Sequence, residues 1–121
     1  MNQSVARAIW CLRIALAFVF LYASISSLLS PGDWIGFIPD WMAKIPPGAD
    51  LELKGHASFE LLLGIWLLTG KMGFYAAVVA GLDLLAITLV NINVMSVVFR
   101  DVGLALAAAA LAFLNKEPAQ K

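Results

Sequence analysis

Long apolar stretches separated by shorter polar segments dominate the chain. The stretches are continuous rather than alternating, which favours helices over barrel strands. A membrane-spanning helix needs about 20 mostly apolar residues, and the first and third stretches meet that length. The second contains Glu60, and the fourth is long enough only if Arg100 and Asp101 lie within it. The sequence predicts an all-α, four-helix transmembrane bundle in one domain, residues 1–121, with helices at about 8–29, 53–69, 72–91 and 94–114.

The segment between the first two predicted helices differs in composition from the rest of the chain. It contains prolines and glycines, which break helices, together with Trp34, Phe37 and Trp41. Because tryptophan is enriched at membrane–water interfaces, the segment predicts an extracytoplasmic loop on the membrane surface. Two roles for its aromatic side chains stay open. They are interface anchors of a loop packed over the helix ends, or a lid over a ligand.

The composition narrows the class of protein. Hydrophobic residues make up 62% of the chain and charged residues 13%, whereas soluble domains contain about 45–50% apolar and about 25% charged residues. The composition therefore argues against a soluble domain and for a protein whose surroundings are the lipid bilayer. The formal net charge is zero, so no basic field indicates a nucleic-acid partner.

The residue types that carry chemistry are few. Cys11 is the only cysteine, which excludes an internal disulfide and a paired-cysteine redox site. His56 and Glu60 have the i,i+4 spacing of metal ligands, but two ligands are too few, so no metal site is predicted. No P-loop, GxSxG or HExxH motif occurs. No catalytic residue is predicted, and a stand-alone enzyme is not favoured.

The basic residues favour one orientation in the membrane. Placing both termini in the cytoplasm puts Arg7, Lys71, Lys116 and Lys121 on that side and leaves Lys44 and Lys54 outside. Loops rich in lysine and arginine stay in the cytoplasm. We therefore expect a multi-pass protein of a bacterial-type cytoplasmic (inner) membrane with N-in, C-in topology.

Several ionisable residues lie within or at the ends of the predicted spans. A charge at the bilayer centre costs about 2.5–3.5 kcal/mol on insertion scales, so such side chains face the bundle interior and find partners. They are the candidate ligand-binding or ion-pair residues: Arg13, His56, Glu60, Asp83, Arg100 and Asp101.

Helical geometry suggests how these residues meet. Counting 1.5 Å per residue from the outer helix ends places Glu60 and Arg100 at similar depths, which predicts an ion pair between them. Arg13 lies nearer the inner side, and its long side chain either reaches toward Asp83 or extends to the inner interface. On the first helix, Arg13 shares one face with Ala17, Phe20, Ser24 and Ser27, and Arg13 and the two serines make it a polar face.

Four short stretches carry a resemblance to a known family. They are Leu12–Ala17 with Phe20, Phe59–Gly64, Leu67–Lys71 and Phe99–Leu104. In these the chain resembles the DoxX-like family of small four-helix membrane proteins, named after a subunit associated with thiosulfate:quinone oxidoreductase. The resemblance implies that Glu60 is the family's characteristic acidic residue in the second helix. Relatives with thiol chemistry use paired cysteines, which this chain lacks.

The leading functional hypothesis is an accessory subunit of a membrane oxidoreductase system that binds a lipophilic, quinone-like molecule. Glu60 and Arg100 would hold the molecule, with His56 at the entrance and the 34–41 loop as cover. One alternative is a structural or assembly protein whose intramembrane charges are interhelical staples and whose partner is another membrane protein. A further alternative is a small proton-linked transporter, for which Asp83 near mid-membrane is the indication.

Overall fold

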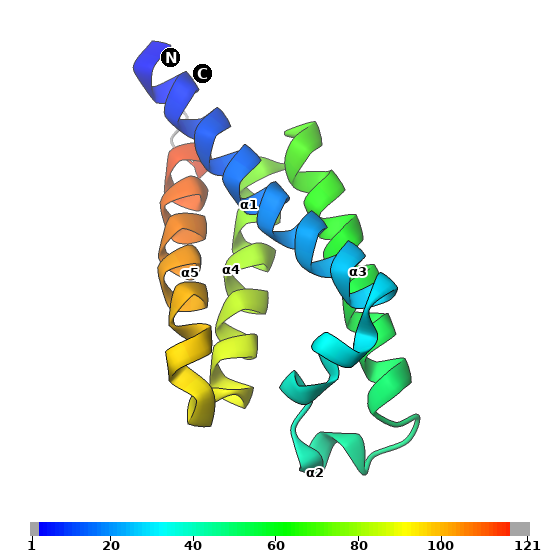
Figure 1. The fold of residues 1–121 in the computed structure, drawn as a ribbon. Helices are drawn as coiled ribbons and strands as arrows, with labels where there is room; N and C mark the ends of the chain where they lie inside the picture. The colour runs from blue at the N-terminus through cyan, green and yellow to red at the C-terminus, as the bar shows by residue number, and fades with distance from the viewer. Residues whose placement is uncertain (1–2, 117–121) are drawn as a thin grey trace.

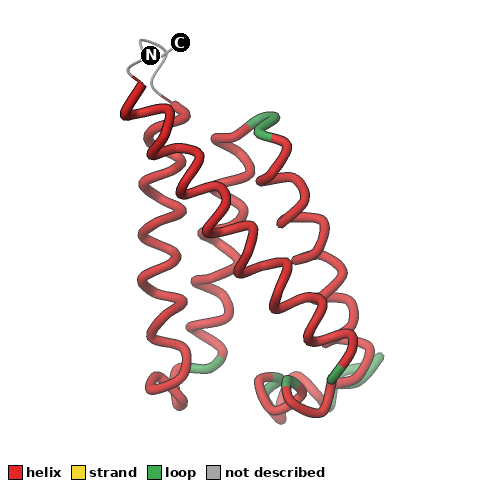
Figure 2. Tube along the Cα trace, turned by 45° about the horizontal axis from the view of Figure 1, so that its top comes forward, coloured by secondary structure: helices red, strands yellow, loops and turns green. Residues whose placement is uncertain are grey.

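Helices make up nearly all of residues 3–116, the part of the chain that the computed structural model describes (Figure 1). No strand occurs in this part, and Figure 2 shows only short loops between the helices. The predicted all-α class is confirmed. The four long helices are α1 (Gln3–Leu29), α3 (Ala49–Thr69), α4 (Gly73–Val90) and α5 (Met95–Lys116).

The segment between α1 and α3 is folded rather than extended. It consists of two 3-10 turns, Pro31–Asp33 and Ile35–Phe37, and the short helix α2 (Asp40–Ala43). A third 3-10 turn, Ile92–Val94, links α4 to α5. α3 begins at Ala49, earlier than predicted, with Asp50 and Glu52 in its first turn. Acidic side chains stabilise that end of a helix, which explains why the polar residues before position 53 are helical.

The long helices form two closely packed pairs, α1 with α3 and α4 with α5. α1 also contacts α5, and α3 contacts α4 over a smaller interface. Successive long helices run in opposite directions (Figure 1). As a result the start of α1, the end of α5 and the α3–α4 turn lie at one end of the molecule, called here the terminal end. The segment 30–48 and the α4–α5 turn lie at the other, the loop end.

Small residues bring the paired helices close together. A Cβ atom added to Gly64 of α3 would lie 2.9 Å from the Leu21 side chain and 3.4 Å from the Ala17 carbonyl oxygen of α1. Such small-residue faces allow close backbone approach between membrane helices. The predicted polar face of α1 is confirmed as its buried face. In the α4–α5 pair the buried small residues are Ala76, Ala77, Ala80, Ala105, Ala108 and Ala112.

Within residues 3–116, three helices are long and apolar enough to cross a membrane: α1, α4 and the Val98–Asn115 part of α5. α3 is not among them, because its first half is charged and Glu60 follows. The outward surface of α3 is nevertheless apolar, with exposed Phe59, Leu62 and Ile65. Multiple apolar helices of this kind indicate a multi-pass membrane protein.

Candidate functional site

A cavity of about 710 Å³ lies at the loop end of the molecule. The second half of α1 and the first half of α3 form two of its walls, and the end of α4 with the start of α5 form the others. Ligand-binding cavities in proteins typically measure about 300–1,000 Å³, so this one has the size of a small-molecule site. Its lining is mainly apolar, including Phe18, Tyr22, Leu53, Leu84 and Ile87.

The segment between α1 and α3 covers part of this cavity. Trp34 and Phe37 line it, with their ring centroids 6.0 Å apart. The Trp34 indole N–H donates a hydrogen bond to the Ser26 hydroxyl at 2.9 Å, which fixes the segment to α1. Trp41 is not part of the lining and is 59% exposed. Two of the three predicted loop aromatics therefore have the position of a lid, and the third faces outward.

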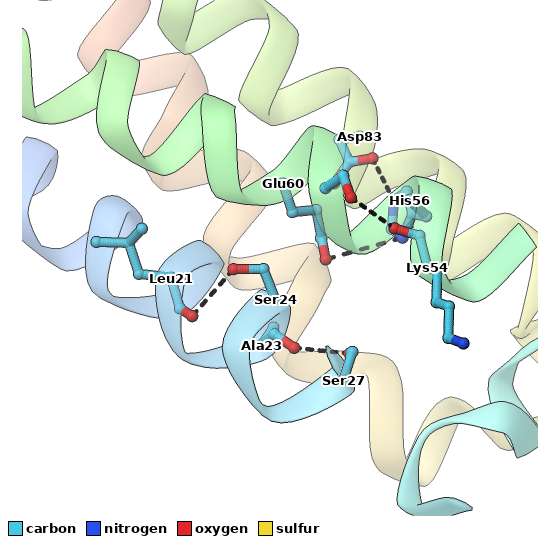
Figure 3. A network of polar contacts seen from close by, with 9 residues as sticks. Leu21, Ala23, Ser24, Ser27, Lys54, His56, Glu60 and Asp83 are labelled. Atoms are coloured by element: carbon cyan, nitrogen blue, oxygen red, sulfur yellow. Dashed lines mark hydrogen bonds and ion pairs between the residues drawn. The ribbon is translucent and has the colours of Figure 1, made fainter. Parts of the chain in front are cut away.

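The polar end of the cavity is built by His56, Glu60 and Asp83, called here the polar cluster. His56 lies between the two carboxyl groups (Figure 3). Its Nε2 is 2.8 Å from Asp83 Oδ1, a hydrogen bond, and its Nδ1 is 3.8 Å from Glu60 Oε1. His56 and Glu60 lie one turn apart on α3, whereas Asp83 comes from α4. The cluster thus joins the two helix pairs.

Burial makes the two carboxyl groups of the cluster unusual. The side chains of Glu60 and Asp83 are 7% and 8% exposed, whereas that of His56 is 37% exposed. Asp83 Oδ2 is buried and has no hydrogen-bond partner within the described part of the chain. Lys54, the nearest lysine along α3, pairs with Asp50 at 3.1 Å and points away from the cluster (Figure 3). A buried polar atom without a partner is costly, so this one marks a place where a ligand would be stabilised.

Arg100 and Asp101 also line the cavity, but the predicted ion pair between Glu60 and Arg100 is not formed among the described residues. The prediction matched the depths of the two side chains and assumed that their helices are neighbours. In the structure α3 packs mainly on α1 and contacts α4, and α5 packs on α4 and α1. The partner that Glu60 and His56 meet across the helix interface is therefore Asp83.

Arg13 lies far from the cavity, toward the terminal end. Its Nε and one terminal nitrogen donate hydrogen bonds to the carbonyl oxygens of Leu67 at 2.9 Å and Leu68 at 2.8 Å. Its guanidinium carbon is 3.9 Å from the centroid of the Trp10 ring. A cation at these carbonyls satisfies the last turn of α3 and its dipole. Arg13 thus does not reach Asp83, and its partner is the end of α3.

Two features of the site were not predicted. The first is the His56–Asp83 contact, although the sequence holds a signal for it. His56 lies 14 residues before Gly70 and Asp83 lies 13 residues after it, so an antiparallel pair of helices that turns at Gly70 brings them level. The second is Glu52, which lines the cavity and has a buried Oε1 without a hydrogen-bond partner among the described residues. The sequence placed Glu52 in the loop between the first two predicted helices.

The arrangement offers defined chemistry at one end of an apolar cavity. His56 has a ring nitrogen that accepts or donates a proton, and the carboxyl groups of Glu60 and Asp83 lie beside it. Arg100 is a permanent hydrogen-bond donor on the α5 wall. A molecule with an apolar body and a polar head therefore finds matching surfaces. No nucleophile activated by a base is present in the lining.

Comparison with known proteins gives one match. A family model described as DoxX matches residues 8–93, which include most of α1, all of α3 and α4, and the polar cluster. No curated protein and no solved structure matches the chain significantly.

Proposed function

The chain belongs to the DoxX family, and from that premise we propose that it binds a lipophilic, quinone-like molecule as an accessory subunit of a membrane oxidoreductase system. The observation that carries this proposal is the cavity of about 710 Å³, apolar along its walls and ionisable at one end. Its volume suits a ring with a short tail. The partner would be another membrane protein of that system.

Different residues of the cavity bind different parts of the molecule. Arg100 donates hydrogen bonds to a carbonyl oxygen of the head group. His56 and Glu60 orient the head group from the opposite wall and exchange a proton with it. Trp34 and Phe37 cover the ring from the loop side, where aromatic faces stack favourably. The α1 and α4 side chains surround the apolar part.

The placement in the membrane belongs to the same proposal. α3 is embedded with α1, α4 and α5, supported by its exposed apolar surface. The 30–48 segment is extracytoplasmic and both termini are cytoplasmic in a bacterial-type inner membrane. The start of α1, with Arg7, and the α3–α4 turn, with Lys71, lie at the terminal end, in agreement with the tendency of basic residues to stay inside. The cavity then opens near the outer surface.

Equilibrium binding of a short-chain quinone to the purified protein in mild detergent tests the proposal. We expect saturable binding of about one molecule per chain, the number that fits a single small-molecule cavity. Ala23 lines the cavity and Ala109 is exposed on α5, so Ala23→Phe should abolish binding and Ala109→Phe should not. Binding that never saturates, or equal binding by both variants, would overturn the proposal.

A further inference from the structure

We propose that His56, Glu60 and Asp83 form a binding site for one divalent transition-metal ion of the Zn²⁺ type. Each residue offers one ligand atom, and these three atoms lie within 4.8 Å of one another. The two carboxylates and one imidazole come from two helices. Sequence spacing supplied only His56 and Glu60, and the fold adds Asp83 as the third ligand.

The ligand set selects the kind of ion. Carboxylate oxygens and a neutral imidazole nitrogen are ligands of Zn²⁺ and related divalent ions, at metal–ligand distances of about 2.0–2.2 Å. Ligand atoms around one such ion stand about 3–3.5 Å apart. An imidazole binds one ion through a single nitrogen, and in the structure Asp83 contacts Nε2 whereas Glu60 contacts Nδ1. One ligand atom from each residue nevertheless lies within 4.8 Å of the others, so side-chain rotations that bring both carboxylates to the same ring nitrogen would close the site. Mg²⁺ prefers oxygen ligands in an octahedron and suits this set less well.

An independent observation points to a cation here. The Asp83 side chain is only 8% exposed. Its Oδ2 atom has no hydrogen-bond partner among the described residues. No lysine or arginine in that part of the chain forms an ion pair with Glu60 or Asp83. Two buried carboxyl groups beside one imidazole leave an excess of negative charge in a low-dielectric environment. A divalent cation neutralises both carboxylates and satisfies the free oxygen.

The ligands stand on rigid elements at the edge of a cavity, as is common for metal sites. All three ligands stand on helices rather than on a mobile loop, which holds them near their binding geometry. Asp101 on α5 interacts electrostatically with Glu60 and Asp83, and more strongly with the neighbouring Arg100, whose positive charge offsets it. The three ligands line the cavity, so a remaining coordination position faces the cavity and is open to water or to a bound molecule. This inference goes beyond quinone binding and does not depend on it.

The single histidine of the chain allows a direct test on the unaltered protein. The protein is labelled with ¹⁵N-histidine, purified through an affinity tag without histidines, and stripped with a chelator. Its two ring-nitrogen resonances are then recorded as Zn²⁺ is added. We expect one nitrogen of His56 to shift to a metal-bound position, complete at one equivalent. Unchanged resonances after several equivalents of Zn²⁺ would overturn the inference without any variant being needed.

Substitutions identify the other two ligands. Asp83→Asn and Glu60→Gln should each weaken Zn²⁺ binding by more than about 100-fold, since loss of an outer-shell group alone costs about 10–100-fold. Asp50→Asn is the matched control, because Asp50 is on α3, is 62% exposed at its side chain and pairs with Lys54. Equal Zn²⁺ affinities of Asp83→Asn and Asp50→Asn would contradict the assignment. Quinone binding measured on the metal-free protein separates failure of this site from failure of the cavity proposal.

Discussion

His56 of α3 and Asp83 of α4 lie 2.8 Å apart, from Nε2 to Oδ1, across one of the smaller helix interfaces of the molecule. The other contacts of α3 are mainly with α1, and those of α4 mainly with α5. A polar contact of this kind therefore connects two helix pairs that share little apolar surface.

This relationship predicts an energetic coupling between the two side chains. In a double-mutant cycle with His56→Gln and Asp83→Asn, the pair should contribute about 1–2 kcal/mol to the free energy of unfolding in detergent. The reason is that each single variant leaves a largely buried partner without its hydrogen bond. The exposed Lys54–Asp50 pair serves as the control cycle and should contribute less than about 1 kcal/mol. A His56–Asp83 coupling near zero would contradict the role of this contact.

Glu60→Gln distinguishes a binding role from a structural one. Glu60 interacts with His56 at 3.8 Å and with the Asp83 side chain, and glutamine keeps the side-chain length and an acceptor oxygen for these contacts, so the substitution should leave the fold intact. We expect the variant to insert, to remain monodisperse and to unfold within about 0.5 kcal/mol of the parent protein, while quinone affinity falls by about tenfold or more, the effect of losing one hydrogen bond. If Glu60→Gln instead fails to accumulate in the membrane, Glu60 is an interhelical staple, as in the assembly-protein hypothesis.

Arg13 should affect stability without affecting the cavity. Arg13→Gln removes two charge-assisted hydrogen bonds to the Leu67 and Leu68 carbonyls, and we expect a loss of about 2–3 kcal/mol in the free energy of unfolding. Quinone and Zn²⁺ affinities should stay within a factor of two or so, since the site lies at the other end of the molecule. Arg7→Gln is the matched control, because Arg7 is exposed on the same helix. A parallel loss of ligand affinity in Arg13→Gln would refute this separation.

Some features of the fold and the site could be predicted from the sequence, and others could not. The face of α1 with Arg13, Ala17 and Phe20 follows from helical periodicity, because 100° per residue fixes which side chains share a face. Periodicity and depth are properties of one helix, however, and they do not say which helices are neighbours. For that reason the predicted Glu60–Arg100 pair is absent while the cavity still holds both residues.

The turn at Gly70 determines which residues of α3 and α4 lie opposite each other, which the depth of each residue in the membrane does not. Gly70 adopts a left-handed conformation with φ of 75°, and an added Cβ would lie 2.5 Å from an Arg13 nitrogen. The turn is therefore tight, and residues equally distant from it along α3 and α4 come level. Counting from the turn places Asp83 opposite His56. From the sequence alone, only His56 and Glu60 were candidate ligands, so no metal site was predicted. Asp83 becomes a third candidate only once α3 and α4 are known to be antiparallel neighbours.

Alanine substitutions at two glycines of α3 should change the free energy of unfolding in opposite directions. At Gly64 a Cβ would lie 2.9 Å from Leu21, so Gly64→Ala should push α1 and α3 apart and cost about 1–3 kcal/mol. At Gly55 nothing lies within 4 Å, so Gly55→Ala should stabilise the protein by about 0.5–1 kcal/mol through helix propensity. Thermal unfolding in one detergent compares the two. Similar changes of the same sign would show that α1 and α3 do not pack closely at Gly64.

Orientation in the membrane is open to a direct measurement because Cys11 is the only cysteine. In a Cys11→Ser background, single cysteines replace Asp40 in α2 and Lys71 in the α3–α4 turn, both of which are exposed. The two positions lie at opposite ends of the molecule, so they report opposite sides of the membrane. With both termini cytoplasmic, a membrane-impermeant maleimide added to intact spheroplasts should label Asp40→Cys and should label Lys71→Cys only after the membrane is opened. The reverse pattern would show that the cavity opens to the cytoplasm. A quinone-like head group and a metal ion would then reach the polar cluster from the reducing side, and the lid formed by Trp34 and Phe37 would face cytoplasmic rather than external partners.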